Sequence, residues 1–206
     1  MRVLGISGDP TGKSKVDTLV KTVLENSKYT DTEFISLREL NIGPCKGCFS
    51  CIKTNHCTVQ DDWNSVESKV KEAEILILGV PTYYGAAFGI NALTHSFLER
   101  WFSLRHKGIK LNLKKVILII VSGGEHENTA ITNLKTFFEI YHGVTDIEVI
   151  VSRGSIPCLV CGEGESCPIS FAIEMYGEGL KITPDIMPSL EKQNDVIEKS
   201  KLILSK

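Results

Sequence analysis

The sequence lacks a strong excess of charge of either sign. Its 206 residues include 23 Lys and Arg against 25 Asp and Glu, which gives a formal net charge of −2. Binding to nucleic acid or to an acidic membrane surface depends on a basic field, and this composition does not supply one. We therefore expect no nucleic acid and no membrane among the partners.

Long apolar runs are also missing. The longest, residues 75–78 and 116–121, are far shorter than the roughly 20 apolar residues that span a bilayer. The N-terminus has a short strand-like pattern and no hydrophobic region typical of a signal peptide. We therefore expect a cytoplasmic protein whose cysteines meet a reducing environment, where clustered thiols hold metal more often than they form disulfides.

Internal repeats, low-complexity segments and linkers are absent as well. A hydrophobic content of 42% and a charged content of 23% are ordinary for a globular protein. A chain of this length is long enough to bury a sizeable core. We predict one domain over residues 1–206, with irregular inserts at 39–60 and 153–188.

Short apolar segments alternate with amphipathic ones along most of the chain. Strands are expected over residues 2–6, 32–37, 74–80, 115–121 and 146–151. Helices are expected over residues 15–26 and 62–73, from after Gly85 to about Ser103, and over 127–141 and 191–204. This alternation predicts a doubly wound α/β fold with a five-stranded parallel sheet.

Three small polar loops follow strands, at the sheet edge where doubly wound folds bind ligands. The first, residues 7–14, leads into a helix N-terminus and offers N–H groups and a helix dipole to a phosphate. It differs from a Walker A loop because Ser7 stands where that pattern has glycine. The alternative is a plain turn between a strand and a helix.

The second and third loops, residues 81–85 and 122–124, suit the rest of a flat cofactor. Tyrosine rings in the second could cover a heterocycle, and glycines in the third let the backbone approach the ligand's polar edge. The predicted cofactor-binding residues are Ser7, Gly8, Thr11, Gly12, Lys13, Ser14, Pro81, Thr82, Tyr83, Tyr84, Gly85, Ser122, Gly123 and Gly124.

Four of the seven cysteines, Cys45, Cys48, Cys51 and Cys57, follow the spacing C-x2-C-x2-C-x5-C. Packing does not require four thiols so close together, whereas short spacers let one loop direct several thiolates toward a common centre. Three interpretations stay open: an iron–sulfur cluster, zinc or another metal, and unligated or oxidised thiols. Structural zinc usually has two C-x2-C pairs separated by a longer spacer.

The three loop motifs together resemble the flavodoxin-like NAD(P)H-dependent FMN reductase family. They read strand–Ser-x-x-x-x-Gly-x-Ser–helix, strand–Pro-Thr-Tyr-Tyr-Gly…Phe-Leu-Glu-Arg and strand–Ser-Gly-Gly, over about residues 1–151 and the last helix. With the cysteine motif between the second and third strands, the chain resembles the iron–sulfur flavoproteins of archaea and anaerobes. The resemblance implies a flavodoxin-like fold, FMN on the three loops and a [4Fe–4S] cluster on the four cysteines. It also implies homo-oligomers, dimers or tetramers, in which a cluster lies near a neighbouring subunit's flavin.

Two features depart from or refine that pattern. The family's first loop reads like Ser-Pro-Arg-Lys…Asn-Thr, whereas this chain has Gly8-Asp9-Pro10. Because a carboxylate repels a phosphate dianion, we expect Asp9 to point away from the ligand. Glu99-Arg100 matches the family's Asp-Arg pair, and we expect it to tie its helix to the sheet.

A second cysteine group, Cys158, Cys161 and Cys167, repeats the x2 and x5 spacings. Three thiols make an incomplete site for zinc or a cubane cluster. In a strand order of 2-1-3-4-5 the two groups leave opposite margins of the sheet, about 19 Å apart, so one shared centre within a subunit is not expected. An intersubunit arrangement, a Cys161–Cys167 disulfide and lining of the flavin pocket stay open, and we favour a structural or protective role.

These observations predict an FMN-dependent electron-transfer oxidoreductase. A cluster at the ligand edge of the sheet would pass electrons between a ferredoxin-like donor, or NAD(P)H, and FMN, which reduces a small-molecule acceptor. No amino acid is expected to act as a catalytic acid, base or nucleophile. One alternative is an NAD(P)H-dependent FMN or quinone reductase without a redox-active cluster. Another is a phosphate-binding regulator or NTPase, although the chain lacks an evident Walker B acid.

Overall fold

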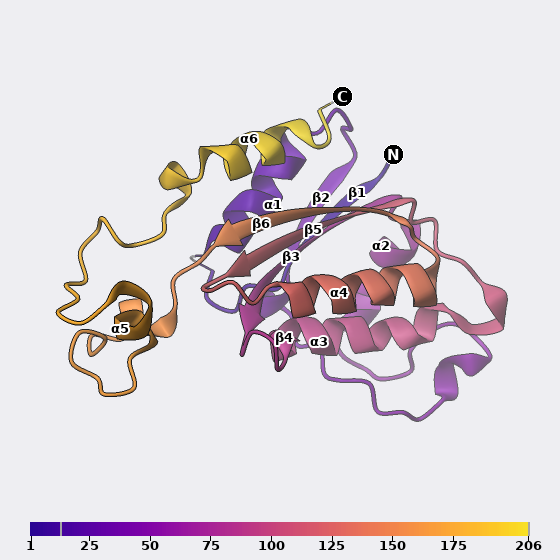
Figure 1. Ribbon diagram of the computed structural model, residues 1–206. Helices are drawn as coiled ribbons and strands as arrows, with labels where there is room; N and C mark the ends of the chain where they lie inside the picture. Colours follow the sequence, from indigo (N-terminus) through magenta and orange to yellow (C-terminus); the bar gives the residue numbers. More distant parts are fainter. Residues whose placement is uncertain (13, 206) are drawn as a thin grey trace.

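The computed structural model describes residues 1–12 and 14–205, so the predicted site residue Lys13 lies outside the described residues. A parallel sheet forms its centre (Figure 1). The strands are β1 (Val3–Ser7), β2 (Thr32–Ser36), β3 (Ile75–Tyr83), β5 (Lys115–Ser122) and β6 (Asp146–Arg153), in the order β2-β1-β3-β5-β6. Adjacent strands of this path are all parallel. The predicted five parallel strands and their order are confirmed.

The central strands are apolar on both faces because helices cover both faces of the sheet. Consecutive residues of β3 alternate between two cores, with Ile77 on one side and Leu78 on the other. The helices α1 (Lys15–Glu25) and α6 (Asn194–Leu202) cover one face (Figure 1). The other face carries α2 (Trp63–Glu72), α3 (Ala92–Glu99) and α4 (Asn128–Thr136). None of the helices in the described residues is long and apolar enough to cross a bilayer.

The helix expected to start soon after Gly85 begins later than predicted. Strand β3 continues through Pro81 to Tyr83, and the two-residue strand β4 (Gly89–Ile90) turns back to pair with it in antiparallel fashion. The turn between them needs left-handed backbone, with φ of 49° at Tyr84 and 45° at Gly85. Helix α3 therefore starts only at Ala92 and continues as a 3-10 turn over Arg100–Leu104.

The other helices lie close to their predicted positions. The segment predicted over 127–141 is α4 followed by a π-helical turn, Phe137–Tyr141. The C-terminal helix is shorter than predicted, because a 3-10 turn, Leu190–Lys192, precedes α6.

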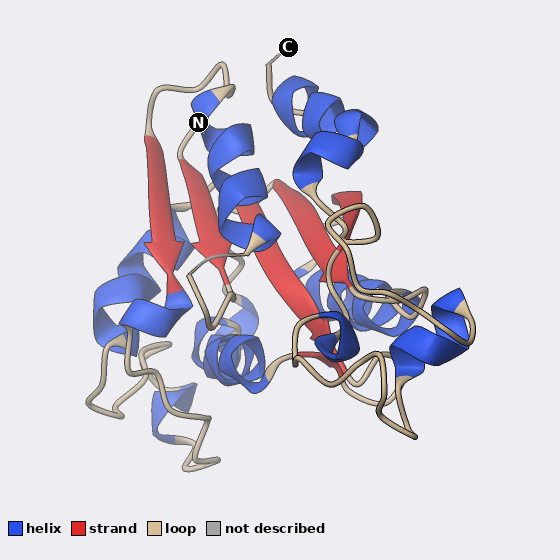
Figure 2. Cartoon of the chain, turned by 90° about the vertical axis from the view of Figure 1, so that its left-hand side faces the viewer, coloured by secondary structure: helices blue, strands red, loops and turns tan. Residues whose placement is uncertain are grey.

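The two inserts differ in how they are built (Figure 2). The first is irregular apart from a 3-10 turn at Ser50–Ile52. The second, which follows β6, contains a 3-10 turn, Pro157–Leu159, and α5 (Phe171–Tyr176). It has a small hydrophobic cluster of its own, formed by Ile156, Leu159, Ala172 and Leu180. Neither α5 nor this cluster was expected from the sequence.

Candidate functional site

The three predicted loops lie at the carboxyl ends of neighbouring strands, because β1, β3 and β5 are adjacent and parallel. The amide of Gly8 donates to the carbonyl of Gly79 at 2.8 Å, which joins the first loop to β3. The hydroxyl of Thr82 lies 3.2 Å from the hydroxyl of Ser122, which joins the second loop to the third. The structure thus brings the predicted loops together, while their contacts to a ligand stay a prediction.

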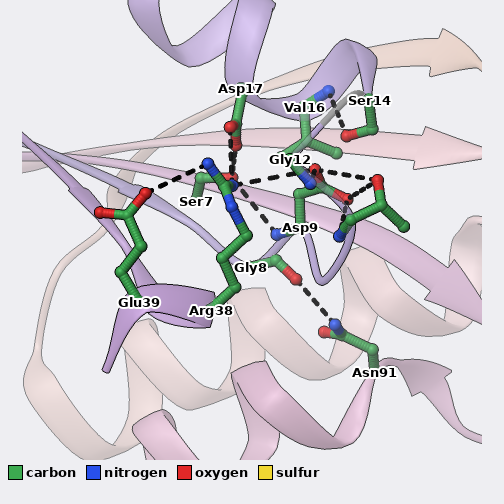
Figure 3. A network of polar contacts seen from close by, with 11 residues as sticks. Ser7, Gly8, Asp9, Gly12, Ser14, Val16, Asp17, Arg38, Glu39 and Asn91 are labelled. Carbon is green, nitrogen blue, oxygen red and sulfur yellow. Dashed lines mark hydrogen bonds and ion pairs between the residues drawn. The ribbon is translucent and has the colours of Figure 1, made fainter. Parts of the chain in front are cut away.

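In the first loop, the hydroxyl groups already have protein partners (Figure 3). The fully buried Ser7 hydroxyl donates to the carboxylate of Asp17 and accepts the amide N–H of Asp9 at 3.3 Å. Asp17 in turn pairs with Arg38, whose guanidinium lies 2.8 Å away. The Ser14 hydroxyl accepts the N–H of Val16 at 3.1 Å and so caps α1.

The Asp9 side chain turns back into its own loop, and its direction relative to a bound ligand stays a prediction. Its buried carboxylate accepts the N–H of Gly12 at 2.6 Å and both the N–H and the hydroxyl of Thr11 at 3.1 Å (Figure 3). Burial by itself raises the pKa of Asp9, but the donors on Thr11 and Gly12 lower it below its usual value. The reason is local: N–H groups before a helix need acceptors, and an Asp two or three residues earlier supplies them.

The first loop is also fixed against the start of α3. Asn91 caps that helix by accepting the N–H of Thr94, and its own amide donates to the carbonyl of Gly8 at 2.7 Å. A Cβ atom on Gly8 would lie 2.0 Å from the hydroxyl oxygen of Thr94. Gly8 is therefore required by the close packing of this loop on α3.

The second loop presents two accessible aromatic rings. The side chain of Tyr83 is 44% exposed and that of Tyr84 is 78% exposed. Tyr84 packs edge-to-face with Phe88, with ring centroids 5.2 Å apart. Such rings at the tip of a hairpin are free to pack against a flat cofactor.

The third loop is held by an arginine that the sequence analysis missed. Arg153 donates to the carbonyl of Gly124 at 2.7 Å and pairs with Glu127 at 2.9 Å. Burial raises the pKa of Glu127, but its hydrogen bond to Arg153 lowers it below the usual value. Ile156 of the second insert covers Gly123, where an added Cβ would lie 2.9 Å from it. In the sequence, the signal for Arg153 was a charged residue at the end of a predicted strand.

The four cysteines of the motif line one small cavity, together with Arg100 and Ser103 among others. Cys51 and Cys57 are buried, whereas Cys45 and Cys48 are exposed. We call residues 45–57 the cysteine loop. Burial raises the pKa of Cys51, and negative charge on the other three thiols raises it further. The four sulfurs are therefore near enough to influence one another.

Two consecutive residues at the end of α3 hold both ends of the cysteine loop. The carboxylate of Glu99 accepts the N–H of Cys45 at 3.1 Å. The guanidinium of Arg100, which is 1% exposed, donates to the Cys57 sulfur at 3.2 Å and to Asp61 at 2.5 Å. Burial lowers the pKa of Arg100, but its bonds to Asp61 and Cys57 raise it above the usual value. The prediction that this pair ties its helix to the sheet is wrong, since its partners are in and beside the cysteine loop.

A histidine and a backbone amide complete the surroundings of the thiols. His106 Nε2 lies 3.2 Å from the Cys51 sulfur, and its backbone N–H donates to Asn55 at 2.6 Å. Hydrogen bonds from Ser50, backbone and side chain, lower the pKa of the exposed Cys48 thiol. Sequence spacing gave no signal for His106, because it reaches the loop from beyond α3.

The expected position of the cysteine loop at the ligand edge of the sheet is wrong. Asn91 at the start of α3 binds the first loop, whereas Glu99 at its end binds the cysteine loop. At 1.5 Å per residue this eight-residue helix separates them by about 12 Å. The insert leaves β2 at the carboxyl edge but runs back along the helical layer, because its anchoring partners lie there.

The second cysteine group has a different setting. Among the described residues, the Cys161 thiol has local hydrogen-bond partners: it donates to the carbonyl of Cys158 at 3.6 Å and accepts the N–H of Glu163 at 3.4 Å. Cys167 lines a separate, shallow pocket. The N–H of Ala172 and further donors near it lower the pKa of Cys158. All seven cysteines are free thiols.

The chain is similar in sequence to the proteins of one known family. A family described as NADPH-dependent FMN reductase matches residues 1–155. The chain belongs to this family. An iron–sulfur flavoprotein of Methanocaldococcus jannaschii is 33% identical over 145 residues, 68% of this chain and 73% of that protein. Another, from Methanosarcina thermophila, is 30% identical over 130 residues, 61% of this chain and 65% of that protein.

The solved structure of the Trp repressor binding protein from Bacillus subtilis has the same flavodoxin-like fold. It matches with a TM-score of 0.60 and 17% identity over the full length of both chains. The family match includes the three loops and the cysteine loop and ends before the second cysteine group. Family membership makes the protein a flavin-dependent oxidoreductase.

Proposed function

We propose that the protein is an FMN-dependent electron-transfer oxidoreductase whose cysteine loop holds a [4Fe–4S] cluster. The observation that carries this proposal is the buried Arg100 bonded to one sulfur of a four-thiol cavity, in a chain of a flavin-dependent family. When bound, the cluster exchanges single electrons and FMN exchanges one or two. The donor is ferredoxin-like or NAD(P)H, and the acceptor is a small molecule.

The number of thiols and their shared cavity support a cluster. Within residues 1–12 and 14–205, no group of three or more His, Cys, Asp or Glu is arranged to hold one metal ion. A tetrahedral zinc site needs its thiolate sulfurs about 3.8 Å apart. A cubane binds each thiolate through a different iron atom, so its four sulfurs surround a larger body. Four thiols that line one cavity supply the number of ligands that a cubane needs.

The charge around the thiols supports the same assignment. Four thiolates placed together repel one another, and a buried guanidinium beside Cys57 offsets part of that repulsion. Donors to ligand sulfurs, here Arg100 and the N–H of Ser50, are a common way in which proteins stabilise clusters and tune their potentials. Glu99 fixes the backbone at Cys45.

The flavin would be held by the three loops. We propose that the loop N–H groups, with Ser7, Gly8, Thr11, Gly12, Lys13 and Ser14, surround the ribityl phosphate end. The rings of Tyr83 and Tyr84, with Pro81, Thr82 and Gly85, would pack on the isoalloxazine. The backbone of Ser122, Gly123 and Gly124 would meet its polar edge. These residues bind and orient the cofactor, and none of them needs to transfer a proton.

We also propose a homo-oligomer, a dimer or a tetramer, in a reducing cytoplasm. Because the cysteine loop and the first loop lie at opposite ends of α3, a second copy would bring a cluster closer to a flavin ring. An apolar groove between α3 and α4, lined by Phe88, Leu98, Leu134 and Phe137 among others, offers a surface for that copy. Sedimentation equilibrium tests this proposal: we expect a multiple of the chain mass, and the mass of one chain would contradict it.

The test of the electron-transfer proposal is anaerobic stopped-flow reduction of the bound flavin by reduced ferredoxin, followed at the flavin absorption band. We expect the Cys51→Ser variant to lose its iron and to be reduced by ferredoxin at least about tenfold more slowly than the wild type. The matched control is Cys161→Ser, which removes a thiol of the second group and should leave the rate unchanged. Equal rates for wild type and Cys51→Ser would overturn the proposal.

A second candidate function is an NADPH-dependent FMN or quinone reductase in which the cysteines take no part. The family description favours it, because it names NADPH as the electron donor. Fast reduction by NADPH of a flavin-loaded protein that contains no iron, after anaerobic purification, would establish this function in place of the first.

A further inference from the structure

Two segments beside the four thiols are strongly basic in a chain whose net charge is slightly negative. Residues 44–60 and 100–112 contain six Lys and Arg and no Asp or Glu, whereas the whole chain has a net charge of −2. Arg100 is the buried member of the six. The other five are exposed: Lys46, Lys53, Arg105, Lys107 and Lys110.

The two segments lie side by side (Figure 1). Lys107 Nζ donates to the carbonyl of Lys53 at 2.8 Å, and the N–H of His106 donates to Asn55 at 2.6 Å. His106 Nε2 also lies 3.2 Å from the sulfur of Cys51. These contacts place lysines of both segments on one surface next to the thiols.

Aromatic and aliphatic side chains lie among these cations. Phe49 is 60% exposed and packs edge-to-face with Phe102, with ring centroids 6.1 Å apart. Phe102 packs in turn on His106, at 4.8 Å, and the Arg105 guanidinium lies 5.5 Å from the centre of the Phe102 ring. We call Lys46, Phe49, Ile52, Lys53, Arg105 and Lys107 the basic surface. Apolar side chains within a charged rim are typical of protein interfaces.

The cations of the basic surface are not neutralised within the chain. In residues 1–12 and 14–205, none of them forms an ion pair with a carboxylate. The lysines that follow these segments differ, because Lys114 pairs with Glu74 at 2.6 Å and Lys115 with Glu148 at 2.5 Å. The basic surface thus offers free positive charge to a molecule outside the chain.

Compensation of a bound cluster does not account for these cations. The thiolates and the cluster would add negative charge, and the buried Arg100 beside Cys57 is placed to offset part of it. Exposed lysines contribute little to such an offset, because water and salt screen their charge. They act instead on charges that approach through solvent.

We propose that the basic surface is the docking site of an acidic protein that carries single electrons. This inference rests on the proposed function and adds where the carrier binds and which charge it has. Lys46 lines the thiol cavity, and Cys45 and Cys48 are exposed, so a carrier on this surface is close to the thiols. In the step it serves, the carrier loses one electron and the bound cluster gains it.

The docking site is compatible with the proposed oligomer. None of the residues of the basic surface is among the described residues that line the groove between α3 and α4. A second copy on that groove therefore does not need the basic surface. Charge complementarity would orient the carrier and increase its rate of association.

Isothermal titration calorimetry with a strongly acidic ferredoxin in its oxidised form tests the inference on anaerobically purified, flavin-loaded protein. Both partners are oxidised, so the measurement gives a Kd without electron transfer. The variants are Lys53→Glu, Lys107→Glu and the double variant. The matched control is Lys28→Glu, which makes the same change of charge at an exposed lysine whose N–H donates to Leu204, on the other face of the sheet.

For the wild type we expect a Kd at least about tenfold lower at about 0.02 M salt than at about 0.3 M salt, because salt screens opposite charges. At the lower salt concentration the double variant should bind at least about tenfold more weakly than the wild type, and each single variant should fall between them. Lys28→Glu should stay within about twofold of the wild type. Reduction by methyl viologen radical, a small cation, should be no slower in the double variant.

The inference is overturned if the wild type does not bind the ferredoxin, or if the double variant binds it as tightly as Lys28→Glu does. It is also overturned if a DNA duplex binds the wild type as tightly as the ferredoxin does, because the surface would then be a general site for polyanions. Iron analysis of the same samples tests the proposed function separately. Salt-dependent binding that the double variant loses, by a protein without iron, would contradict the cluster and support the docking site.

Discussion

The two cysteine groups share the same spacing but have different surroundings. Cys48, Cys51 and Cys57 are separated by two and by five residues, as are Cys158, Cys161 and Cys167. The first group has a fourth thiol, a common cavity and a buried arginine. In the second group the thiols have local partners and a small apolar cluster beneath them. Spacing sets which thiols can meet, whereas the element against which the loop packs decides whether they do.

The two groups also differ in their distance from the proposed flavin site. The cysteine loop is fixed to the far end of α3, whereas the second insert packs on the third loop, where Ile156 covers Gly123. Within one chain, the group of four thiols is therefore the one that lies farther from the proposed flavin site. Under the proposed function electron transfer belongs to the first group, and a structural or protective role stays the prediction for the second.

Replacement of single thiols should separate the two groups most strongly. Serine at Cys45, Cys48, Cys51 or Cys57 should reduce the iron content of anaerobically purified protein below about one tenth of the wild-type value, because a cubane needs all four ligands. Serine at Cys158, Cys161 or Cys167 should leave iron unchanged. The measurement is iron and acid-labile sulfide per chain. Loss of iron from a variant of the second group would break the distinction.

Replacement of arginines beside the two groups should separate them in stability. Arg100→Met removes the buried guanidinium partner of the mostly buried Asp61 carboxylate, which should lower the free energy of unfolding by about 3 kcal/mol. Arg153→Met breaks a partly exposed pair with Glu127 and should cost less than about 1 kcal/mol. Urea unfolding of the iron-free proteins measures both changes. Equal losses would show that Arg100 has no special role at the cysteine loop.

Alkylation rates should separate the groups by accessibility and by pKa. With iron bound, thiols of the cysteine loop should react with iodoacetamide at least about tenfold more slowly than Cys158, since ligand thiolates are not free to attack. Because the N–H of Ala172 and other nearby donors lower the pKa of Cys158, its rate should reach half of its maximum at a lower pH than that of an ordinary cysteine. Mass spectrometry of the labelled peptides gives both results. Labelling of Cys48 at the rate of Cys158 in iron-loaded protein would contradict this prediction.

The smallest expected difference concerns two glutamates that accept backbone N–H groups. Glu99 binds the N–H of Cys45 at 3.1 Å, and Glu165 binds the N–H of Ile182 at 2.7 Å in the second insert. Glu99→Gln should increase the rate of iron release to a chelator by a few fold, about the effect of one weakened hydrogen bond. Glu165→Gln should leave that rate unchanged. Identical rates in both variants would remove Glu99 from the description of the cysteine loop.

Much of the fold could be predicted from the sequence, because each buried strand is a continuous apolar segment that ends at a polar or glycine-rich loop. The segment 115–121 is one example, and it forms β5 within one residue of its predicted bounds. The hairpin at Gly89 could not be predicted in this way. Its two residues pair only because β3 extends beyond the sheet, which is a tertiary effect with no local pattern.

The site was predicted less completely, for two physical reasons. The positions of the three loops follow from the ends of their strands, so their meeting could be predicted. The direction of a single side chain depends instead on which backbone N–H groups nearby lack a hydrogen-bond acceptor. Asp9 illustrates this, since it turns inward to the N–H groups of its own loop. Long-range contacts are the second reason: nothing in the spacing of Arg100 or His106 indicates that they reach Cys57 and Cys51.

The central claim is that the cysteine loop holds a cluster in a protein that also binds flavin. The most direct measurement is the iron, acid-labile sulfide and flavin content of one anaerobically purified sample, together with its absorption spectrum. We predict about four iron atoms and four sulfides per chain beside the flavin band. A sample that contains flavin but neither iron nor sulfide, even after reconstitution with both, would contradict the claim.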